Sequence, residues 1–445
     1  MRFLQIRQLA LVFYLAMLSG ECARGTDVHD LLSSGIIAPS QDLDHLIEEK
    51  NYPEFERELP SAKLTRNDRL YFEGVLADRL NQPERAIASL EKVLPELITS
   101  NRKRAVVALD ALGQDDFMMG RYSEATARYT ELLRRFDSFL DEAERRAAKD
   151  NRDTFGLLGN SASQTISGER SFSVPIRQDR LGDIDVPLKI GASSEWWIFD
   201  TGANITTITR STAKRLGLSI SKGHAQTQSG PTGAEVSLST AIIPDIAFGR
   251  AVIHNVVVLV MDDKDLNIDI GARQRYQING ILGYPVLAEL GRFTVRENAI
   301  EIGSSLAPST RMAGLYVEEL TPLIAAAVSG KNIVFQLDTG NTGADLTARF
   351  LKEFPERFTS LKPEQGRSSG AGGAHPATVY RLPELQLNFG SAAATLKNVS
   401  LFAGDRGEFL DKLYGNLGQA VLRQFRSYTI DFTHMQLMLG TAATR

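Results

Sequence analysis

The feature that most constrains the fold of this 445-residue chain is a pattern that occurs twice in its C-terminal part. Each copy has an apolar run, the triplet Asp-Thr-Gly and, further along, an apolar block that ends in glycine. The first copy has Asp200-Thr201-Gly202 and Gly283, and the second has Asp338-Thr339-Gly340 and Gly418. One triplet alone is a weak signal, because average residue usage produces it by chance in roughly one chain in ten of this size. Two copies with the same flanking pattern indicate a duplicated unit.

The match between the copies extends beyond the triplets. The apolar runs that precede the triplets are Trp196–Phe199 and Ile333–Leu337. After the two glycines, further apolar pairs and runs fall at identical offsets, namely Val286-Leu287 with Val421-Leu422, and Phe293–Val295 with Tyr428–Ile430. This agreement indicates two copies of one β unit and disfavours the alternative of two unrelated turns in a β protein.

Both copies lie in a region whose sequence pattern is typical of a β protein. Short runs rich in β-branched and aromatic residues are separated by Gly, Asp, Asn and Ser, which is typical of a barrel or sandwich. Other runs of this kind are Phe172–Ile176, Ile184–Ile190 and Val252–Val260. The preceding residues, 151–170, are polar and rich in Gly, Ser and Asn, and this composition predicts a linker.

The order apolar strand, Asp-Thr-Gly, apolar-apolar-Gly resembles the aspartic proteases, and in particular the short retroviral-type (retropepsin-like) lobe. The resemblance covers about residues 171–445 and implies two lobes in one chain, 171–306 and 311–445, as in pepsin. It implies that Asp200 and Asp338 are the catalytic pair, one from each lobe. It also implies that the neighbouring residues support the two active-site loops, namely Thr201, Gly202, Thr339 and Gly340.

A pair of aspartates has the chemistry that such an enzyme needs. Peptide hydrolysis without a metal requires an activated water and an acid. Two carboxylates in one site do not both ionise easily, because each negative charge raises the proton affinity of the other. The charged carboxylate then accepts a proton from the water, while the protonated one hydrogen-bonds the carbonyl oxygen. The titration belongs to the pair, so the sequence leaves open which aspartate is the base.

Each copy also contains a glycine-rich segment that is a candidate for a flap. In the family such hairpins close over a bound peptide, whereas turn chemistry alone is equally consistent with ordinary surface turns. The resemblance assigns substrate-binding positions to Gly230 and Gly233, to Gly372 and Gly373, and to Ala203 and Asn341, which follow the triplets. Asn341 departs from the Ala or Ser that the family usually has, and a larger polar residue there would reshape the substrate channel or weaken activity.

Residues 28–150 are predicted to be helical, because apolar residues recur there at spacings of three and four. Within them a pattern repeats with an offset of 39 residues: Gly74 matches Gly113, Ala86 matches Ala125, and Leu90 matches Tyr129. Small residues opposite larger apolar ones allow helices to pack closely, and the pattern resembles the tetratricopeptide repeat, whose period is about 34. A generic pair of helical hairpins remains the alternative.

The first 25 residues are predicted to be an export signal. Arg2 and Arg7 form a positively charged start before an apolar run, Leu9–Leu18, that is too short to span a bilayer as a helix. We therefore expect a periplasmic or secreted protein with no integral membrane span after signal removal. The alternative is an apolar helix that packs on the body. Cys22 suggests a lipid anchor, but Glu21 directly before it is the wrong residue for that site.

Composition disfavours several other classes of protein. Lys and Arg total 50 while Asp and Glu total 54, so no basic excess favours a nucleic-acid partner. One cysteine and six histidines argue against an internal disulfide, a thiolate metal site and the common zinc hydrolases. We therefore expect no metal and no cofactor.

The predicted fold class is multidomain α + β, with an N-terminal α-helical repeat domain followed by a mostly-β, bilobal aspartic-protease (pepsin/retropepsin-like) fold. The predicted function is that of an exported aspartic endopeptidase that acts on a polypeptide, with the helical repeats as a site for a further protein partner. The alternatives are a catalytically silent peptide-binding protein and a scaffold that uses the protease fold and the repeats for recognition. The two intact triplets favour the enzyme.

Overall fold

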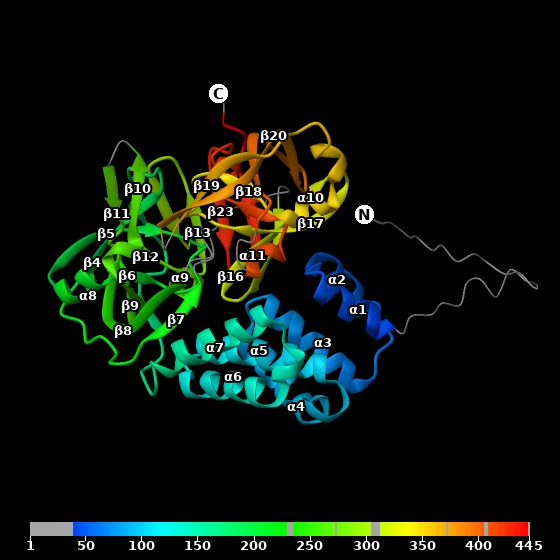
Figure 1. Ribbon diagram of the computed structural model, residues 1–445. Helices are drawn as coiled ribbons and strands as arrows, with labels where there is room; N and C mark the ends of the chain where they lie inside the picture. Colours follow the sequence, from blue (N-terminus) through cyan, green and yellow to red (C-terminus); the bar gives the residue numbers. More distant parts are fainter. Residues whose placement is uncertain are drawn as a thin grey trace, which may run out of the picture.

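The computed structural model describes residues 39–443 except 229–234, 272–273, 304–311, 371–372 and 405–407. The expected export signal with Cys22 therefore lies outside the described residues, and so do Gly230, Gly233 and Gly372. Within the described part, a helical region precedes a β-rich region, and the helices form a layer alongside the strands (Figure 1). None of the helices described is long and apolar enough to cross a membrane.

The helical region runs from α1 to α7. Its helices are α1 (Pro39–Glu48), α2 (Tyr52–Glu58), α3 (Arg66–Arg79), α4 (Pro83–Ser100), α5 (Arg102–Met118), α6 (Tyr122–Phe136) and α7 (Glu142–Gly156). Polar side chains cap several of the first turns, since Thr65, Asn101 and Asp141 accept backbone N–H groups at the starts of α3, α5 and α7. The helix α7 extends into the segment expected to be a linker, because Phe155 is buried in the helical core.

The repeat seen in the sequence has a counterpart in the packing of these helices. Gly74 of α3 faces Leu90 of α4, and Gly113 of α5 faces Tyr129 of α6. A Cβ atom would lie 2.7 Å from the Leu90 side chain at the first glycine and 2.5 Å from that of Tyr129 at the second. The expected close packing at the repeated positions is confirmed, while the assignment to the tetratricopeptide repeat stays a prediction.

The β-rich region begins within the segment expected to be a linker and contains both copies of the duplicated pattern. The strands of its first part are β1 (Thr165–Gly168), β2 (Phe172–Pro175), β3 (Arg177–Gln178), β4 (Ile184–Ile190), β5 (Ser193–Phe199), β6 (Thr207–Thr209), β7 (Ala225–Gln228), β8 (Glu235–Phe248), β9 (Ala251–Met261), β10 (Asn267–Gly271), β11 (Gln274–Gln277), β12 (Gly280–Leu282), β13 (Arg292–Val295) and β14 (Ala299–Ile302). The short helices α8 (Arg210–Arg215) and α9 (Tyr284–Leu290) also belong to it.

The second part has strands in a similar order. They are β15 (Met312–Glu318), β16 (Thr321–Val328), β17 (Lys331–Leu337), β18 (Ala344–Leu346), β19 (Glu364–Gly370), β20 (Gly373–Phe389), β21 (Ala392–Phe402), β22 (Gly415–Leu417), β23 (Tyr428–Asp431) and β24 (Gln436–Leu439). Its short helices are α10 (Ala348–Glu353), α11 (Glu408–Asp411) and α12 (Gln419–Leu422).

The duplication in the sequence is also a duplication of strand topology. In the first part, β4 pairs antiparallel with β5, β5 parallel with β12, β12 antiparallel with β6, β6 parallel with β9, and the hairpins β9–β8 and β8–β7 follow. In the second part the strands pair in the same order and with the same directions, namely β16, β17, β22, β18, β21, β20 and β19. Each triplet thus follows the same strand of the same topological unit.

The two copies are joined by a shared sheet rather than by a linker alone. Strand β13 of the first part pairs antiparallel with β23 of the second, so that Phe293 lies opposite Ile430. On one side of this seam β14 pairs with β13 and β2 with β14, and on the other β24 pairs with β23 and β15 with β24. Strands from both ends of the β-rich region therefore form one continuous sheet.

Buried polar contacts fix the helical region against the β-rich region. The carboxylate of Glu318, at the end of β15, pairs with Lys50 and with Arg79 of α3, whose Nη2 lies 3.3 Å from Oε1. Asn81 donates to the carbonyl of Phe432 at 3.2 Å and accepts from the hydroxyl of Tyr284 at 2.8 Å. Because Tyr284 belongs to the first part and Phe432 to the second, the helices contact both.

We expect Glu318→Gln to lower the free energy of unfolding by about 3 kcal/mol, because it removes the carboxylate from two buried cations, of which, among the described residues, only Arg79 keeps another partner, Asp78. Burial alone would raise the pKa of Glu318, but Lys50 and Arg79 outweigh it and lower that pKa to about 2. Since the folded-state pKa is the lower one, this stabilisation is present above the unfolded-state pKa and is lost as the pH falls towards 2. Urea unfolding at pH 7 and pH 3 measures both effects.

The adjacent Glu319 provides a matched control. Burial raises its pKa to about 8, so at pH 7 it is mostly protonated and glutamine is a close mimic. Glu319→Gln should change the free energy of unfolding by much less than Glu318→Gln. Equal losses in the two variants would contradict a charged role for Glu318.

Candidate functional site

The two triplets occupy equivalent positions, because each follows a strand that is held by the glycine-ending block. Asp200 follows β5 and its N–H donates to Leu282 O at 3.1 Å. Asp338 follows β17 and its N–H donates to Leu417 O at 3.0 Å. The residues before Gly283 and Gly418 thus hold the two aspartate loops, which gives the repeated spacing in the sequence its physical meaning.

Two threonine hydroxyls lock the loops to each other. The hydroxyl of Thr201 donates to Leu337 O at 2.7 Å and accepts the N–H of Thr339 at 3.0 Å. In the reverse direction, the hydroxyl of Thr339 donates to Phe199 O at 2.8 Å and accepts the N–H of Thr201 at 3.0 Å. Both threonines are fully buried. The support role that the sequence suggested for them therefore has a defined geometry.

The two glycines of the triplets allow the carboxyl groups to approach. A Cβ atom on Gly202 would lie 2.4 Å from Cγ of Asp338, and one on Gly340 would lie 2.3 Å from Cγ of Asp200. The N–H groups of these glycines also donate to the carboxyl oxygens, at 2.7 Å from Gly202 to Asp200 and at 2.9 Å from Gly340 to Asp338. Any larger residue would displace the carboxyl group of the other copy.

The environment of the pair favours the uncharged form of one carboxyl. Burial raises the pKa of Asp200 well above its usual range, and the negative charge of Asp338 and a hydrogen bond with its side chain raise it further. Asp183, which precedes β4, is a third carboxyl nearby, and burial together with Asp179 and Asp338 raises its pKa to about 8. The site is thus built to hold protons at neutral pH.

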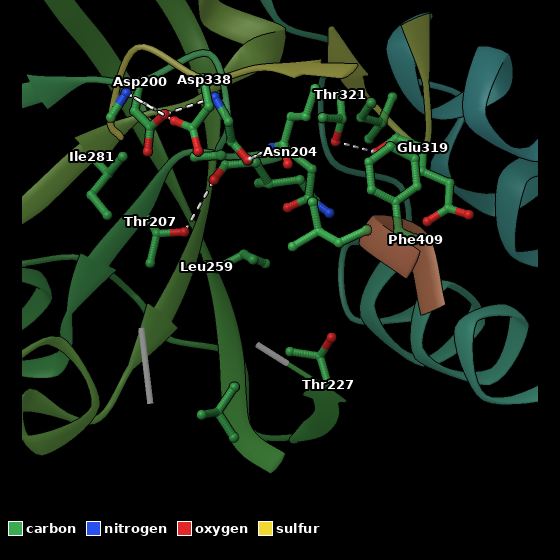
Figure 2. Close-up of a pocket in the computed structure, with 18 of the residues that line it drawn as sticks. Asp200, Asn204, Thr207, Thr227, Leu259, Ile281, Glu319, Thr321, Asp338 and Phe409 are labelled. Carbon is green, nitrogen blue, oxygen red and sulfur yellow. Dashed lines mark hydrogen bonds between the residues drawn. The ribbon is translucent and has the colours of Figure 1, made fainter. Parts of the chain in front are cut away.

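Asp200 and Asp338 face a cavity of about 580 Å³. Figure 2 shows the two aspartates side by side, with Thr207, Leu259 and Ile281 on one wall and Glu319, Thr321 and Phe409 to one side. A further wall comes from the helical region, since one face of α7 lines the same cavity with Ala143, Ala147, Asp150, Asn151 and Thr154. The cavity is therefore bounded by both β copies and by the helices.

The structure places the expected substrate-binding residues as follows. Ala203 and Asn341 both line the cavity. Asn341 is held by its own loop, because its Oδ1 accepts the N–H of Gly343 at 2.8 Å and its Nδ2 donates to Asp345 at 3.3 Å. Gly373 opens β20 and pairs with Gly370 in the hairpin β19–β20.

The other expected flap residues fall between the paired strands of the two hairpins. Gly230 and Gly233 lie between β7 and β8, which pair as a hairpin in the first copy, and Gly372 lies between β19 and β20. All three are outside the described residues.

Several residues at the site were not predicted from the sequence. Asn416 donates from Nδ2 to Oδ2 of Asp338 at 2.6 Å. It stands where the first copy has Ile281, so aligning the two copies position by position would have marked it. Asp183 and the α7 residues carry no comparable signal, because their approach to the cavity depends on tertiary contacts. Among the described residues, no cluster of three or more His, Cys, Asp or Glu side chains is placed to hold a metal ion.

Comparison with known proteins relates the first copy to the aspartyl proteases. The family model described as aspartyl protease matches residues 186–286, which run from β4 through the first triplet to Gly283 and α9. A search of curated proteins found no match. The family match indicates a protease in general terms and covers the part of the chain that carries Asp200.

We expect Thr339→Val to lower the free energy of unfolding by at least about 2 kcal/mol, because it leaves a buried carbonyl and a buried N–H without partners. Thr339→Ser keeps the hydroxyl and should cost only the loss of one buried methyl group, about 1 kcal/mol. Urea unfolding of the two variants compares these losses directly. If valine were tolerated as well as serine, the hydroxyl would not be what holds the loops.

Proposed function

We propose that this protein is an aspartic endopeptidase with one catalytic site built from two pepsin-like or retropepsin-like lobes. The observation that carries the proposal is the meeting of Asp200 and Asp338 through the reciprocal threonine hydrogen bonds, at the edge of a cavity. The aspartyl protease family match over the first copy supports it, and the repeated strand topology extends the argument to the second copy.

The proposed reaction is hydrolysis of a peptide bond by a water held between the two carboxyl groups. One carboxylate accepts a proton from the water as its oxygen attacks the peptide carbonyl carbon. The protonated partner donates a hydrogen bond to the carbonyl oxygen, where negative charge develops. The raised pKa of Asp200 favours a pair in which one carboxyl group is protonated while the other is charged. Substrates are extended polypeptide segments, which suit a cavity bordered by the hairpin β7–β8.

The helical region is proposed to form part of the substrate site. Residues of α7 that recur on one helix face line the cavity together with the aspartates. The adjoining Leu157 lies close to Gly223, just before strand β7 of the first hairpin. The small and polar side chains on this face leave room for a peptide backbone and offer it hydrogen bonds. Recognition of a further protein partner by the repeats stays a prediction.

The proposal includes export to the periplasm or the exterior of the cell, which rests on the charged and apolar pattern of residues 1–25. The alternative function is a silent peptide-binding or scaffold protein with the same fold. It shares the cavity and the helical wall but requires no turnover, so variants of the aspartates separate the two.

We expect Asp200→Asn and Asp338→Asn each to reduce cleavage of an unfolded-protein substrate by about 10²-fold to 10⁴-fold, because each removes one proton-transfer group. Asp245→Asn, an exposed aspartate in the same β-rich region, should retain wild-type cleavage. Turnover is measured with a labelled unfolded protein, and circular dichroism checks that the fold persists. Wild-type rates in either catalytic variant would rule out the paired mechanism.

We expect Ala147→Trp to reduce kcat/KM for a peptide substrate tenfold or more, because the indole would fill part of the cavity next to the aspartates. Lys149→Trp places the same side chain two residues away on the exposed side of α7 and should leave kcat/KM unchanged. If both variants cleaved peptides like the wild type, α7 would be a neighbour of the site and not a wall of it.

A further inference from the structure

The two copies match in backbone topology but differ in polarity next to their aspartates. In the first copy, Ile281 of β12 lies opposite Ile198 of β5. In the second copy the same parallel pairing brings together Asn416 of β22 and Gln336 of β17. An apolar pair beside Asp200 is thus replaced by an amide pair beside Asp338. The difference is local, because the flanking positions are glycine or apolar in both copies.

The amide of Asn416 gives the two carboxyl groups different partners. Both oxygens of Asp338 accept an N–H group, Oδ1 from Gly340 at 2.9 Å and Oδ2 from Asn416 at 2.6 Å. On Asp200, Oδ1 accepts from Gly202 at 2.7 Å and from Gly340 at 3.2 Å. Among the described residues, no N–H donor reaches Oδ2 of Asp200. Asn416 is only 5% exposed, so water competes little for its amide.

We propose that Asn416 is a positioning residue that places the negative charge of the pair on Asp338 and leaves the shared proton on Oδ2 of Asp200. An N–H donor stabilises a carboxylate more than a carboxylic acid, and Asp338 has a donor on each of its two oxygens, whereas Oδ2 of Asp200 has none among the described residues. The catalytic roles that follow for the two aspartates rest on the proposed function. Asp338 then accepts the proton of the attacking water, and Asp200 donates to the carbonyl oxygen of the substrate.

The surroundings of the pair agree with this assignment. The raised pKa of Asp200, caused first by burial and then by the charge of Asp338, is that of the protonated member. Gln336 donates to Gly202 O at 3.5 Å and so does not compete for either carboxyl group. The other charged or titratable side chains that line the cavity are Asp183, Asp345, Glu319, Arg146 and Asp150. All of them are retained in the variants below.

The test exchanges the two matched residues. Asn416→Ile removes the donor from Asp338. It should raise the acid-limb pKa, which is the pKa below which kcat/KM falls, by about one pH unit, because the singly charged pair loses a hydrogen bond. Ile281→Asn adds a donor beside Asp200 and should lower that pKa. The double exchange Ile281→Asn with Asn416→Ile should return it close to the wild-type value. Ile281→Asn provides the test on its own if Asn416→Ile does not fold.

A second readout does not depend on catalysis. Titration of ¹³C-carboxyl-labelled aspartates by NMR in the free protein should show the same two opposite shifts and the same return in the double variant. If the wild type cleaved no substrate but the NMR shifts appeared, the proposed function would fail and the charge assignment would stand. If cleavage required both aspartates but Asn416→Ile left the acid limb in place, or moved it to lower pH, the charge assignment would be overturned. A downward shift would mean that the amide oxygen of Asn416 faces a protonated Asp338.

Discussion

Two buried threonine hydroxyls set the distance between the halves of the site. Each donates to the carbonyl that precedes the other copy's aspartate and accepts the other threonine's N–H, so separating the loops would leave all these buried groups without partners. The glycine after each threonine has to lack a side chain, because the opposite carboxyl group occupies that space. Burial raises the pKa of Asp200, and the proximity of Asp338 that results from this geometry raises it further. The threonine hydrogen bonds therefore contribute to the electrostatics of this centre as well as to its geometry.

Much of this centre could be predicted from the sequence, because it depends on local chemistry that occurs twice. The runs before the triplets lie in β5 and β17, and the spacing to Gly283 and Gly418 reflects parallel pairing with β12 and β22. What could not be predicted depends on contacts between distant segments. The residues of α7 that line the cavity follow the spacing of an ordinary amphipathic helix, and their sequence does not indicate a cavity. The polar composition of residues 151–156 suggested a linker, whereas burial of Phe155 keeps them helical.

The duplication separates what the scaffold requires from what the chemistry requires. Positions that hold the loops are the same in both copies, including the threonines, the glycines and the backbone bonds to Leu282 and Leu417. Positions beside the aspartate loops have diverged, and Asn416 and Gln336 stand where the first copy has isoleucines. The two copies thus have the same backbone arrangement but different side chains next to their aspartates. This difference suits a reaction in which one carboxyl group gains a proton while the other gives one up.

The seam between β13 and β23 has a consequence for how the protein is made. A chain emerges from the ribosome from its N-terminus, so the helical region and Asp200 are present well before residues 428–431. Until those residues arrive, β13 lacks its partner and the first triplet lacks the second. A nascent chain therefore carries no complete site until the second copy has been synthesised. The same long-range pairing makes the closing step slow relative to the folding of the helices.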